Sequence, residues 1–443
     1  MERKPLSRLR GLSGSDTGRA AELGIAAMVA NVVGLAFTLV FTRLLGQSGY
    51  GSLGALVSTF LILTVAGYAL QTTVAREVSG ALAAGDADAG RGVRRWLRRL
   101  SVLALGLAVV GLLARDVLAT VIGVEDVPWA AGSTLFAGAV WLILSVERGA
   151  LLGFARYRLV GVSIIAEQVL RLAFGIVLAK GGLDVTGAFL GTPAALACVA
   201  GVLLIPLGRQ LGSAPDEELP GHRLRDLARR AWAPICALGL ISWLQDGNVI
   251  VVKHLASDHD AGAWVAAAVA AKAIMWIAIG LAAYLVPEVA RRAGSGFDAR
   301  PILLKVMGLI AALAVPMVLI YSVAAKVILE KALHVHGGEG ALPFFGLAMS
   351  MLALTYLATQ YQLALHRSRF LFVLALGGLA QPLILAAVGD DLTALAVALL
   401  GLHLAVAAAM LTLALRRPSG DYAEPTVAGE AADASPAPTP TVA

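Results

Sequence analysis

Residues 21–74 read AELGIAAMVANVVGLAFTLVFTRLLGQSGYGSLGALVSTFLILTVAGYALQTTV, and their only charged side chains are Glu22 and Arg43. A helix rises 1.5 Å per residue, so about 20 apolar residues cross the hydrocarbon core of a bilayer. The stretch is long enough for two crossings, separated by a glycine-rich turn. Backbone groups in lipid must be hydrogen-bonded within their own segment, and we therefore expect both crossings to be helices.

The rest of the chain repeats this pattern. Of its 443 residues, 58% are hydrophobic and 14% are charged, against about 25% charged residues in soluble domains. This composition excludes a water-soluble globular protein, a disordered chain and a coiled coil. The expected fold class is an all-α integral membrane protein with about 12 transmembrane helices. Apolar windows place these at residues 21–44, 51–74, 100–122, 130–150, 159–180, 186–208, 231–252, 261–286, 302–326, 341–363, 370–389 and 393–415.

The basic residues predict the orientation. Of the 35 Lys and Arg, 26 lie in stretches on the side of the N-terminus and five lie on the opposite side. Arg148, Arg156 and Arg158 are counted among the 26. Because cytoplasmic loops of membrane proteins carry the excess of Lys and Arg, we expect a multi-pass protein of the cell (plasma) membrane with cytoplasmic N- and C-termini.

An internal repeat divides the chain. At a shift of 211 residues, Gly51 falls on Gly262 and Glu77 on Glu288. This predicts two six-helix lobes related by a parallel pseudo-twofold axis, an architecture typical of transporters. The expected parts are a cytoplasmic N-terminal segment 1–19, an N-lobe 20–208, a cytoplasmic linker 209–230, a C-lobe 231–416 and a disordered cytoplasmic tail 417–443.

Motifs of known enzyme classes are absent from the sequence. It contains no GxxxxGK[ST], HExxH or GxSxG motif, and we expect a protein that is not an enzyme and uses no metal. Cys198 and Cys236 lie in apolar runs and are interpreted as small core residues. The remaining metal-ligating side chains are interpreted as solvated loop residues: His254, His259, His334 and His336.

Two charged residues lie together inside the predicted span 159–180. Glu167 and Arg171 are four residues apart, with the acid first, the favourable order for an ion pair on one helix face. A charge at the centre of a transmembrane helix costs about 2.5–3.5 kcal/mol, so both residues need a reason to be there. They form either a structural ion pair or a polar wall of a central cavity that binds substrate.

The second half carries another set of charges inside its spans. Lys272 lies near the middle of span 261–286 and has no acid three or four residues away. It is a substrate-binding candidate, the alternatives being snorkelling or a distant partner. Gln245, Asp246 and Asn248 form a polar cluster in span 231–252. Asp246 either binds a coupling cation or pairs with Lys272.

Arginines also lie at the ends of spans. Arg43 and Arg76 are further substrate-binding candidates, although snorkelling to the membrane surface is the default for such positions. The segment 91–99 holds five arginines around Trp96. It is expected on the inner membrane face, where anionic lipids would be partners.

Three motifs carry a family resemblance. The pattern R-x-L-G-x-x-x-[YF]-G is met at residues 43–51, ERGALLGFARYRL stands at 147–159, and DGNVIVVKHLASDHDAGAWVAA stands at 246–267. In this order and spacing they resemble the polysaccharide (oligosaccharidyl-lipid, Wzx-type) flippases of the multidrug/oligosaccharidyl-lipid/polysaccharide flippase superfamily. The resemblance covers nearly all of residues 20–415.

The resemblance implies a MATE-like fold and the export of an isoprenoid-diphosphate-linked oligosaccharide, a polysaccharide precursor, by alternating access. It implies no cofactor, but coupling to H⁺, Na⁺ or the membrane potential. Implied partners are the lipid-linked glycan and a glycan polymerase or glycosyltransferases, with no nucleic acid. Two alternatives remain open: a cation-coupled multidrug antiporter of the same fold, and a non-transporting scaffold of a glycan-assembly complex.

Overall fold

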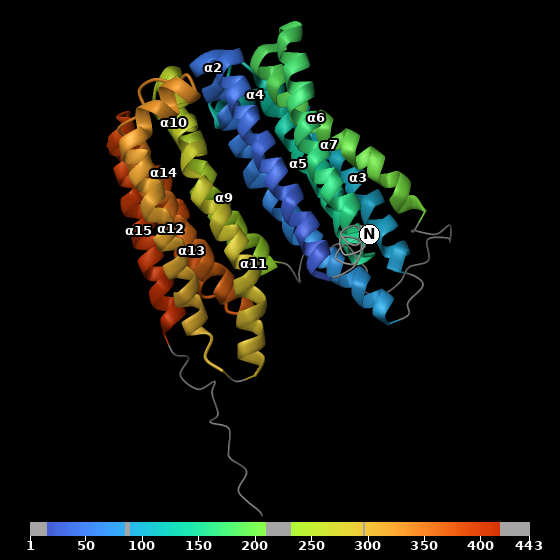
Figure 1. Cartoon of the computed structure of the whole chain (residues 1–443). Helices are drawn as coiled ribbons and strands as arrows, with labels where there is room; N and C mark the ends of the chain where they lie inside the picture. Colours follow the sequence, from blue (N-terminus) through green and yellow to red (C-terminus); the bar gives the residue numbers. More distant parts are fainter. Residues whose placement is uncertain (1–15, 85–88, 210–231, 296, 417–443) are drawn as a thin grey trace, which may run out of the picture.

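The computed structural model describes residues 16–84, 89–209, 232–295 and 297–416. The described residues form long helices and no strand, and the helices gather into two bundles (Figure 1). The first bundle contains α2 (Asp16–Ala83), α3 (Ala89–Leu113), α4 (Arg115–Ile122), α5 (Pro128–Gly153), α6 (Tyr157–Leu178), η1 (Ala179–Leu183) and α7 (Asp184–Gly208). The second contains α9 (Trp232–Leu255), α10 (Asp258–Ala271), α11 (Ala273–Gly294), α12 (Arg300–Lys326), η2 (Val327–Ala332), α13 (Leu342–Ala364), α14 (Phe370–Val388) and α15 (Leu392–Leu415).

By length and composition, ten stretches of the described residues could cross a membrane, and two of them are long enough to cross twice. Residues 22–83 turn back at Gly46, whose φ of 69° interrupts α2. Residues 157–208 turn back at Gly182 and Asp184, whose φ angles are 94° and 41°. Counting these two stretches twice gives twelve crossings. This confirms the all-α fold class and the predicted helix count.

Contacts between the bundles follow the predicted repeat. A methyl group added to Gly51 would stand 2.9 Å from the backbone nitrogen of Gly262, and one added to Gly54 would strike Val265. Both pairs are related by the shift of 211 residues. Residues close to a twofold axis contact their own symmetry mates, so these contacts are those that a pseudo-twofold axis between the two lobes requires.

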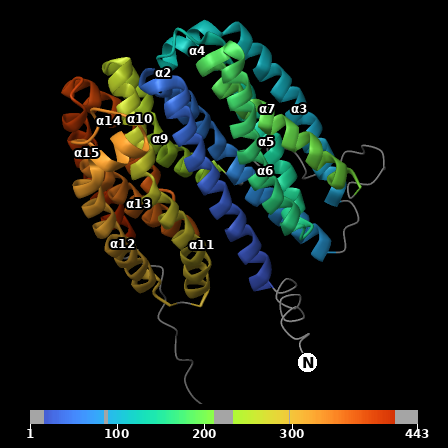
Figure 2. The ribbon, with the colours of Figure 1, turned by 45° about the horizontal axis from the view of Figure 1, so that its top comes forward.

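The two lobes meet at one end of the molecule. Gln47, beside the turn of α2, donates from Nε2 to the carbonyl oxygens of His259 (2.8 Å) and His336 (2.8 Å). A nitrogen of the His254 ring lies 3.0 Å from the carbonyl oxygen of Val121. Toward the opposite end the helices of the two lobes diverge, as both ribbon views show (Figures 1 and 2). We call the end at which the lobes meet the closed end.

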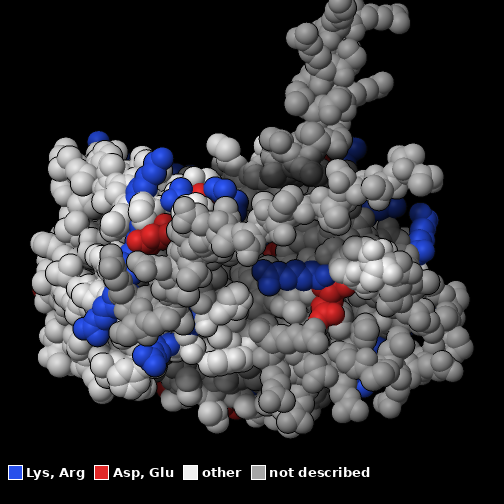
Figure 3. Space-filling view, turned by 90° about the horizontal axis from the view of Figure 1, so that it is seen from below, with Lys and Arg blue, Asp and Glu red and all other residues white. Residues whose placement is uncertain are grey.

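Both ends of the described chain lie opposite the closed end, where α2 begins and α15 finishes (Figure 2). Seen from below, this side of the molecule displays groups of Lys and Arg side chains (Figure 3). Arg291 and Arg292 pair there with Glu288 at the end of α11, and they line a depression together with Phe297 and Asp298. The arrangement agrees with an even number of crossings and with a concentration of basic residues at one end.

The structure corrects three interpretations of single residues. Cys198 and Cys236 are exposed and are not core residues. Segment 91–99 lies within the first three turns of α3, which begins at Ala89, and Trp96 is 2% exposed. Trp96 is therefore part of the protein core, because α3 begins before its apolar window does. The termini 1–15 and 417–443 lie outside the described residues, as does all of the predicted linker 209–230 except its first residue.

Candidate functional site

The C-lobe contains a buried ion pair between Asp246 and Lys272. Asp246 lies on α9, and Lys272 is the single residue between α10 and α11. Lys272 Nζ is 2.5 Å from Asp246 Oδ1. The side chain of Asp246 is 1% exposed, so the cation that neutralises it comes from another helix and not from solvent. The distant-partner interpretation of Lys272 is therefore the one that this conformation shows.

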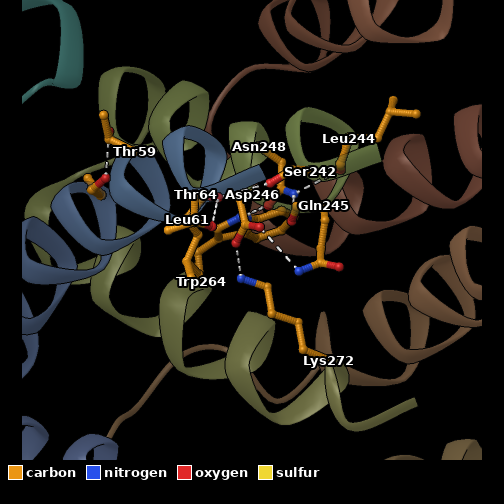
Figure 4. Close-up of polar contacts among 11 residues, drawn as sticks. Thr59, Leu61, Thr64, Ser242, Leu244, Gln245, Asp246, Asn248, Trp264 and Lys272 are labelled. Atoms are coloured by element: carbon orange, nitrogen blue, oxygen red, sulfur yellow. Dashed lines mark hydrogen bonds and ion pairs between the residues drawn. The ribbon is translucent and has the colours of Figure 1, made fainter. Parts of the chain in front are cut away.

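Neighbouring polar groups complete this cluster, as Figure 4 shows. Gln245 donates from Nε2 to Asp246 Oδ2 at 3.1 Å, so both carboxylate oxygens of Asp246 are engaged. Asn248 donates to the carbonyl oxygen of Gln245 at 2.8 Å and accepts from Trp264 Nε1 at 2.9 Å. The three polar residues predicted on span 231–252 therefore lie together, and Asn248 ties α9 to α10.

One member of the cluster was missed by the sequence interpretation. Gln381 lies on α14 and is fully buried. With its amide oriented to satisfy both neighbours, it donates to Leu244 O (3.2 Å) and accepts from Asn248 N (2.8 Å). The sequence signal that could have identified Gln381 is that it is a single polar amide in an otherwise apolar span. Ser242 Oγ lies 3.5 Å from Leu61 O on α2. The lobes therefore also touch beyond the closed end, at a point about one helical turn from this cluster.

The N-lobe contains a second buried ion pair, which differs from the predicted one. Arg148 on α5 donates from Nη2 to Glu167 Oε2 at 2.8 Å and from Nε to Ser163 Oγ at 2.9 Å. Arg148 is 2% exposed, although the sequence interpretation assigned it to a cytoplasmic stretch. Glu167 and Arg171 do not form the ion pair that was one of the two alternatives for them, because α5 carries a closer cation to the same carboxylate.

Arg171 forms no salt bridge with a carboxylate among the described residues, although the Glu167 carboxylate is close enough to act on it electrostatically. Its Cζ atom stands 4.6 Å from the centre of the Phe37 ring on α2, a distance typical of a cation–π contact. The side chain is half-buried, and its Nε is buried without a hydrogen-bond partner in the described part of the chain. A guanidinium of this kind keeps donors available for an anionic group.

Glu147 is the second residue that the sequence interpretation missed. It is fully buried on α5, and neither carboxylate oxygen has a hydrogen-bond partner within the described residues. Its signal was its place beside Arg148 in the ERGALLGFARYRL motif. The predicted span ended at residue 150, whereas the structure continues α5 through Gly153.

The structure does not bring Arg43 and Arg76 into either cluster. Both side chains are exposed, Arg43 beside the turn at Gly46 and Arg76 near the other end of α2. Within the described residues neither forms an ion pair. The arrangement is the one expected for arginines that extend toward the membrane surface.

Solved structures similar to this chain are transporters. The inward-facing conformation of a multidrug resistance MATE family transporter of the MOP superfamily aligns with a TM-score of 0.75 at 13% identity, covering 89% of this chain and 97% of that one. A MATE in complex with MaL6 aligns with a TM-score of 0.65 at 13% identity, covering 91% and 96%. A MOP superfamily transporter from Pyrococcus furiosus, described by a reversed polarity of its binding pocket that suggests a different function, aligns at 0.60 and 13%, with the same coverage.

At these identities the likeness establishes the MATE fold alone. No curated protein matches the chain. The model of one protein family, described as polysaccharide biosynthesis protein, matches residues 20–291. This match spans more than half of the sequence and includes the whole N-lobe, both buried ion pairs and the three motifs noted in the sequence. The chain is a multi-pass membrane transporter that belongs to the polysaccharide biosynthesis protein family.

Proposed function

We propose that this transporter flips an isoprenoid-diphosphate-linked oligosaccharide from the cytoplasmic to the outer leaflet of the plasma membrane by alternating access. The closed end of the lobes then faces outward and both termini face the cytoplasm. Glycosyltransferases deliver the substrate on the cytoplasmic side, and a glycan polymerase is the partner that consumes it. The placement of basic residues at the end opposite the closed end supports this orientation, because cytoplasmic segments carry the excess of Lys and Arg. The family match supports a substrate of polysaccharide biosynthesis.

The main argument for an anionic substrate is the environment of the Arg171 guanidinium. Arg171 lies inside a membrane span, forms no salt bridge in the described structure because Glu167 pairs with Arg148, and keeps a buried Nε without a hydrogen bond. A diphosphate is a strong acceptor for guanidinium donors, and such a charge-assisted bond is strengthened in a low-dielectric site. Arg171 is therefore the leading substrate-binding residue of the N-lobe.

We propose that Lys272 is a second substrate-binding cation, which becomes available only when Asp246 releases it. In the present conformation Asp246 holds its ammonium. A proton or Na⁺ bound at Asp246 would weaken this attraction, and Lys272 could then bind a phosphate oxygen. Asp246, supported by Gln245 and Asn248, is therefore the candidate coupling site, whereas no cofactor takes part.

The proposal is tested by reconstituting the full chain in liposomes that carry a fluorescent isoprenoid-diphosphate oligosaccharide. Transport is measured as the fraction of glycan reached by a membrane-impermeant quencher. Wild type should move the labelled lipid between leaflets, and Arg171→Ala should abolish this movement. In cells, deletion of the gene should trap lipid-linked glycan on the cytoplasmic leaflet.

A multidrug antiporter is the second candidate, and Glu147 is the observation that favours it. A buried carboxyl without a partner suits an organic cation or a transported proton. If deletion of the gene left the surface glycan unchanged and increased drug sensitivity, the antiporter function would be supported and the flippase function rejected. If variants of every buried charge retained full glycan export, a non-transporting scaffold role would replace both.

A further inference from the structure

Three metal-ligating side chains meet at the closed end, away from both buried ion pairs. Glu330 lies on η2, and His336 and Glu339 follow in the segment that leads to α13. One ligand atom from each residue lies within 4.8 Å of the other two. His336 Nδ1 is 3.9 Å from Glu330 Oε1, and Glu339 Oε1 accepts from the backbone nitrogen of Gly337 at 3.3 Å.

One imidazole and two carboxylates form a donor set for a first-row divalent ion such as Zn²⁺. Ligands at about 2.0–2.2 Å from Zn²⁺ stand roughly 3.3–3.6 Å apart in a tetrahedron. The separation between His336 and Glu330 is only slightly larger, so small side-chain rotations would close the site. His336 is exposed, and an ion can therefore enter from water and keep water in its remaining coordination position.

The local charge favours a cation at this site. Glu330 and Glu339 contribute two negative charges within the triad, whereas Lys326 Nζ, 3.9 Å from Glu330 Oε1, supplies one positive charge. Lys326 is largely exposed, so its ammonium can swing into water when an ion takes its place. The exchange leaves the carboxylates neutralised by a divalent ion instead of a weak surface ion pair.

The backbone of His336 is hydrogen-bonded to Gln47 of the N-lobe. His336 donates from its backbone nitrogen to Gln47 Oε1 at 3.0 Å, and Gln47 Nε2 donates to His336 O at 2.8 Å. These are contacts between the lobes, and they must break when the closed end opens. The segment that carries two of the three ligands is therefore ordered by Gln47 in the closed state.

We propose that Glu330, His336 and Glu339 bind a divalent transition-metal ion, with Zn²⁺ as the probe, and that this ion stabilises the state in which the lobes meet at this end. Binding and closure are reciprocal because a ligand that favours one of two states shifts the population toward that state. The site does not bind the transported substrate. The test of metal binding is therefore independent of the proposed flippase activity.

The first experiment titrates the purified full chain in lipid nanodiscs with Zn²⁺ and measures binding by calorimetry. We expect one saturable site. His336→Ala should weaken it at least tenfold, since even the loss of a residue that only supports a metal ligand costs about 10–100-fold. His334→Ala is the matched control, because His334 is exposed two residues away and is not part of the triad. It should stay within about twofold of wild type.

Equal affinities of wild type and His336→Ala would overturn the site, and so would an absence of saturable binding to wild type. Co²⁺ gives a second readout, because its visible absorption should appear with wild type and His334→Ala but not with His336→Ala. A folded His336→Ala variant is shown by an unchanged melting temperature without metal.

The second experiment tests the link to closure. Gln47→Ala keeps all three ligands but removes the hydrogen bonds to His336, and we expect its affinity for Zn²⁺ to fall a few-fold. Crosslinking between the lobes at the closed end should increase with Zn²⁺ in wild type and not in His336→Ala. The proposed stabilisation of the closed state would be refuted if Gln47→Ala bound Zn²⁺ as tightly as wild type, or if Zn²⁺ did not change the crosslinking of wild type.

Discussion

The N-lobe and the C-lobe each bury charged side chains, but they satisfy them differently. In the C-lobe, Lys272 and Asp246 neutralise each other, and Gln245 occupies the second carboxylate oxygen. In the N-lobe, Arg148 pairs with Glu167, while Glu147 and Arg171 keep buried atoms without partners in the described structure.

This difference shows what the internal repeat preserves. Gly51 and Gly262 are repeat mates and pack against each other, so the repeat retains the contact that joins the lobes. The repeat mates of Glu167 and Arg171 are Gly378 and Pro382, which carry no charge. The twofold relation therefore governs the packing of the lobes but not their buried charges.

The largest expected effect comes from breaking the C-lobe pair. Asp246→Ala leaves the Lys272 ammonium buried without a partner, which should destabilise the folded protein by about 3–5 kcal/mol. Adding Lys272→Ala removes the stranded charge, so the double variant should be more stable than Asp246→Ala alone. The measurement is thermal unfolding in detergent across the double-mutant cycle.

Transport by the same variants separates two roles for Lys272. If Lys272 binds the substrate, the double variant should recover stability but not transport, and Lys272→Arg should retain part of the activity. Recovery of both properties in the double variant would make the pair structural. It would also leave Arg171 as the main argument for an anionic substrate.

Arg171→Ala should have a smaller effect on stability and a large effect on transport. The side chain contributes a cation–π contact with Phe37, worth roughly 0.5–2 kcal/mol. Arg148→Ala is the contrasting variant, since it strands Glu167 and should cost several kcal/mol. Equal destabilisation by the two substitutions would mean that Arg171 is as firmly paired as Arg148, contrary to the comparison of the lobes.

Glu147→Gln should change stability still less. The carboxyl has no hydrogen bond to lose among the described residues, and an uncharged amide is less costly to bury than a carboxylate. We expect an unfolding free energy equal to wild type or higher by up to about 1 kcal/mol. Glu167→Gln is the matched control and should be destabilising, because it removes the partner of Arg148. A strongly destabilised Glu147→Gln would show that Glu147 has a partner.

Most of the fold could be predicted because hydropathy and the positions of basic residues are one-dimensional signals. They predicted twelve crossings, and the repeat aligned Gly51 with Gly262, two residues that the structure then shows in contact. The predicted helix boundaries were wrong where a helix continues through polar residues. Arg148 was therefore taken for a loop residue, and Trp96 was placed at the membrane surface instead of in the core.

The pairing of charges could be predicted only in part. Asp246 was named as a rival partner of Lys272, but spacing cannot decide whether two helices turn those faces toward each other. The i, i+4 rule favoured Glu167 with Arg171, yet the rotation of α5 against α6 brought Arg148 to the carboxylate. Gln381 and Glu147 gave no periodic signal, since a single polar residue does not reveal which helix it faces.

The smallest expected effect concerns Arg43 and Arg76, the two substrate-binding candidates that lie outside both clusters. Both are exposed and form no ion pair in the described structure, so Arg43→Gln and Arg76→Gln should each change the unfolding free energy by less than about 0.5 kcal/mol. Each variant should keep at least half of the transport activity in the liposome assay. The two residues lie at opposite ends of the crossings formed by α2, so a loss confined to one variant would identify the membrane face at which an arginine meets the substrate. A loss of transport with unchanged stability in either variant would extend the substrate path beyond the buried clusters to that end of the molecule.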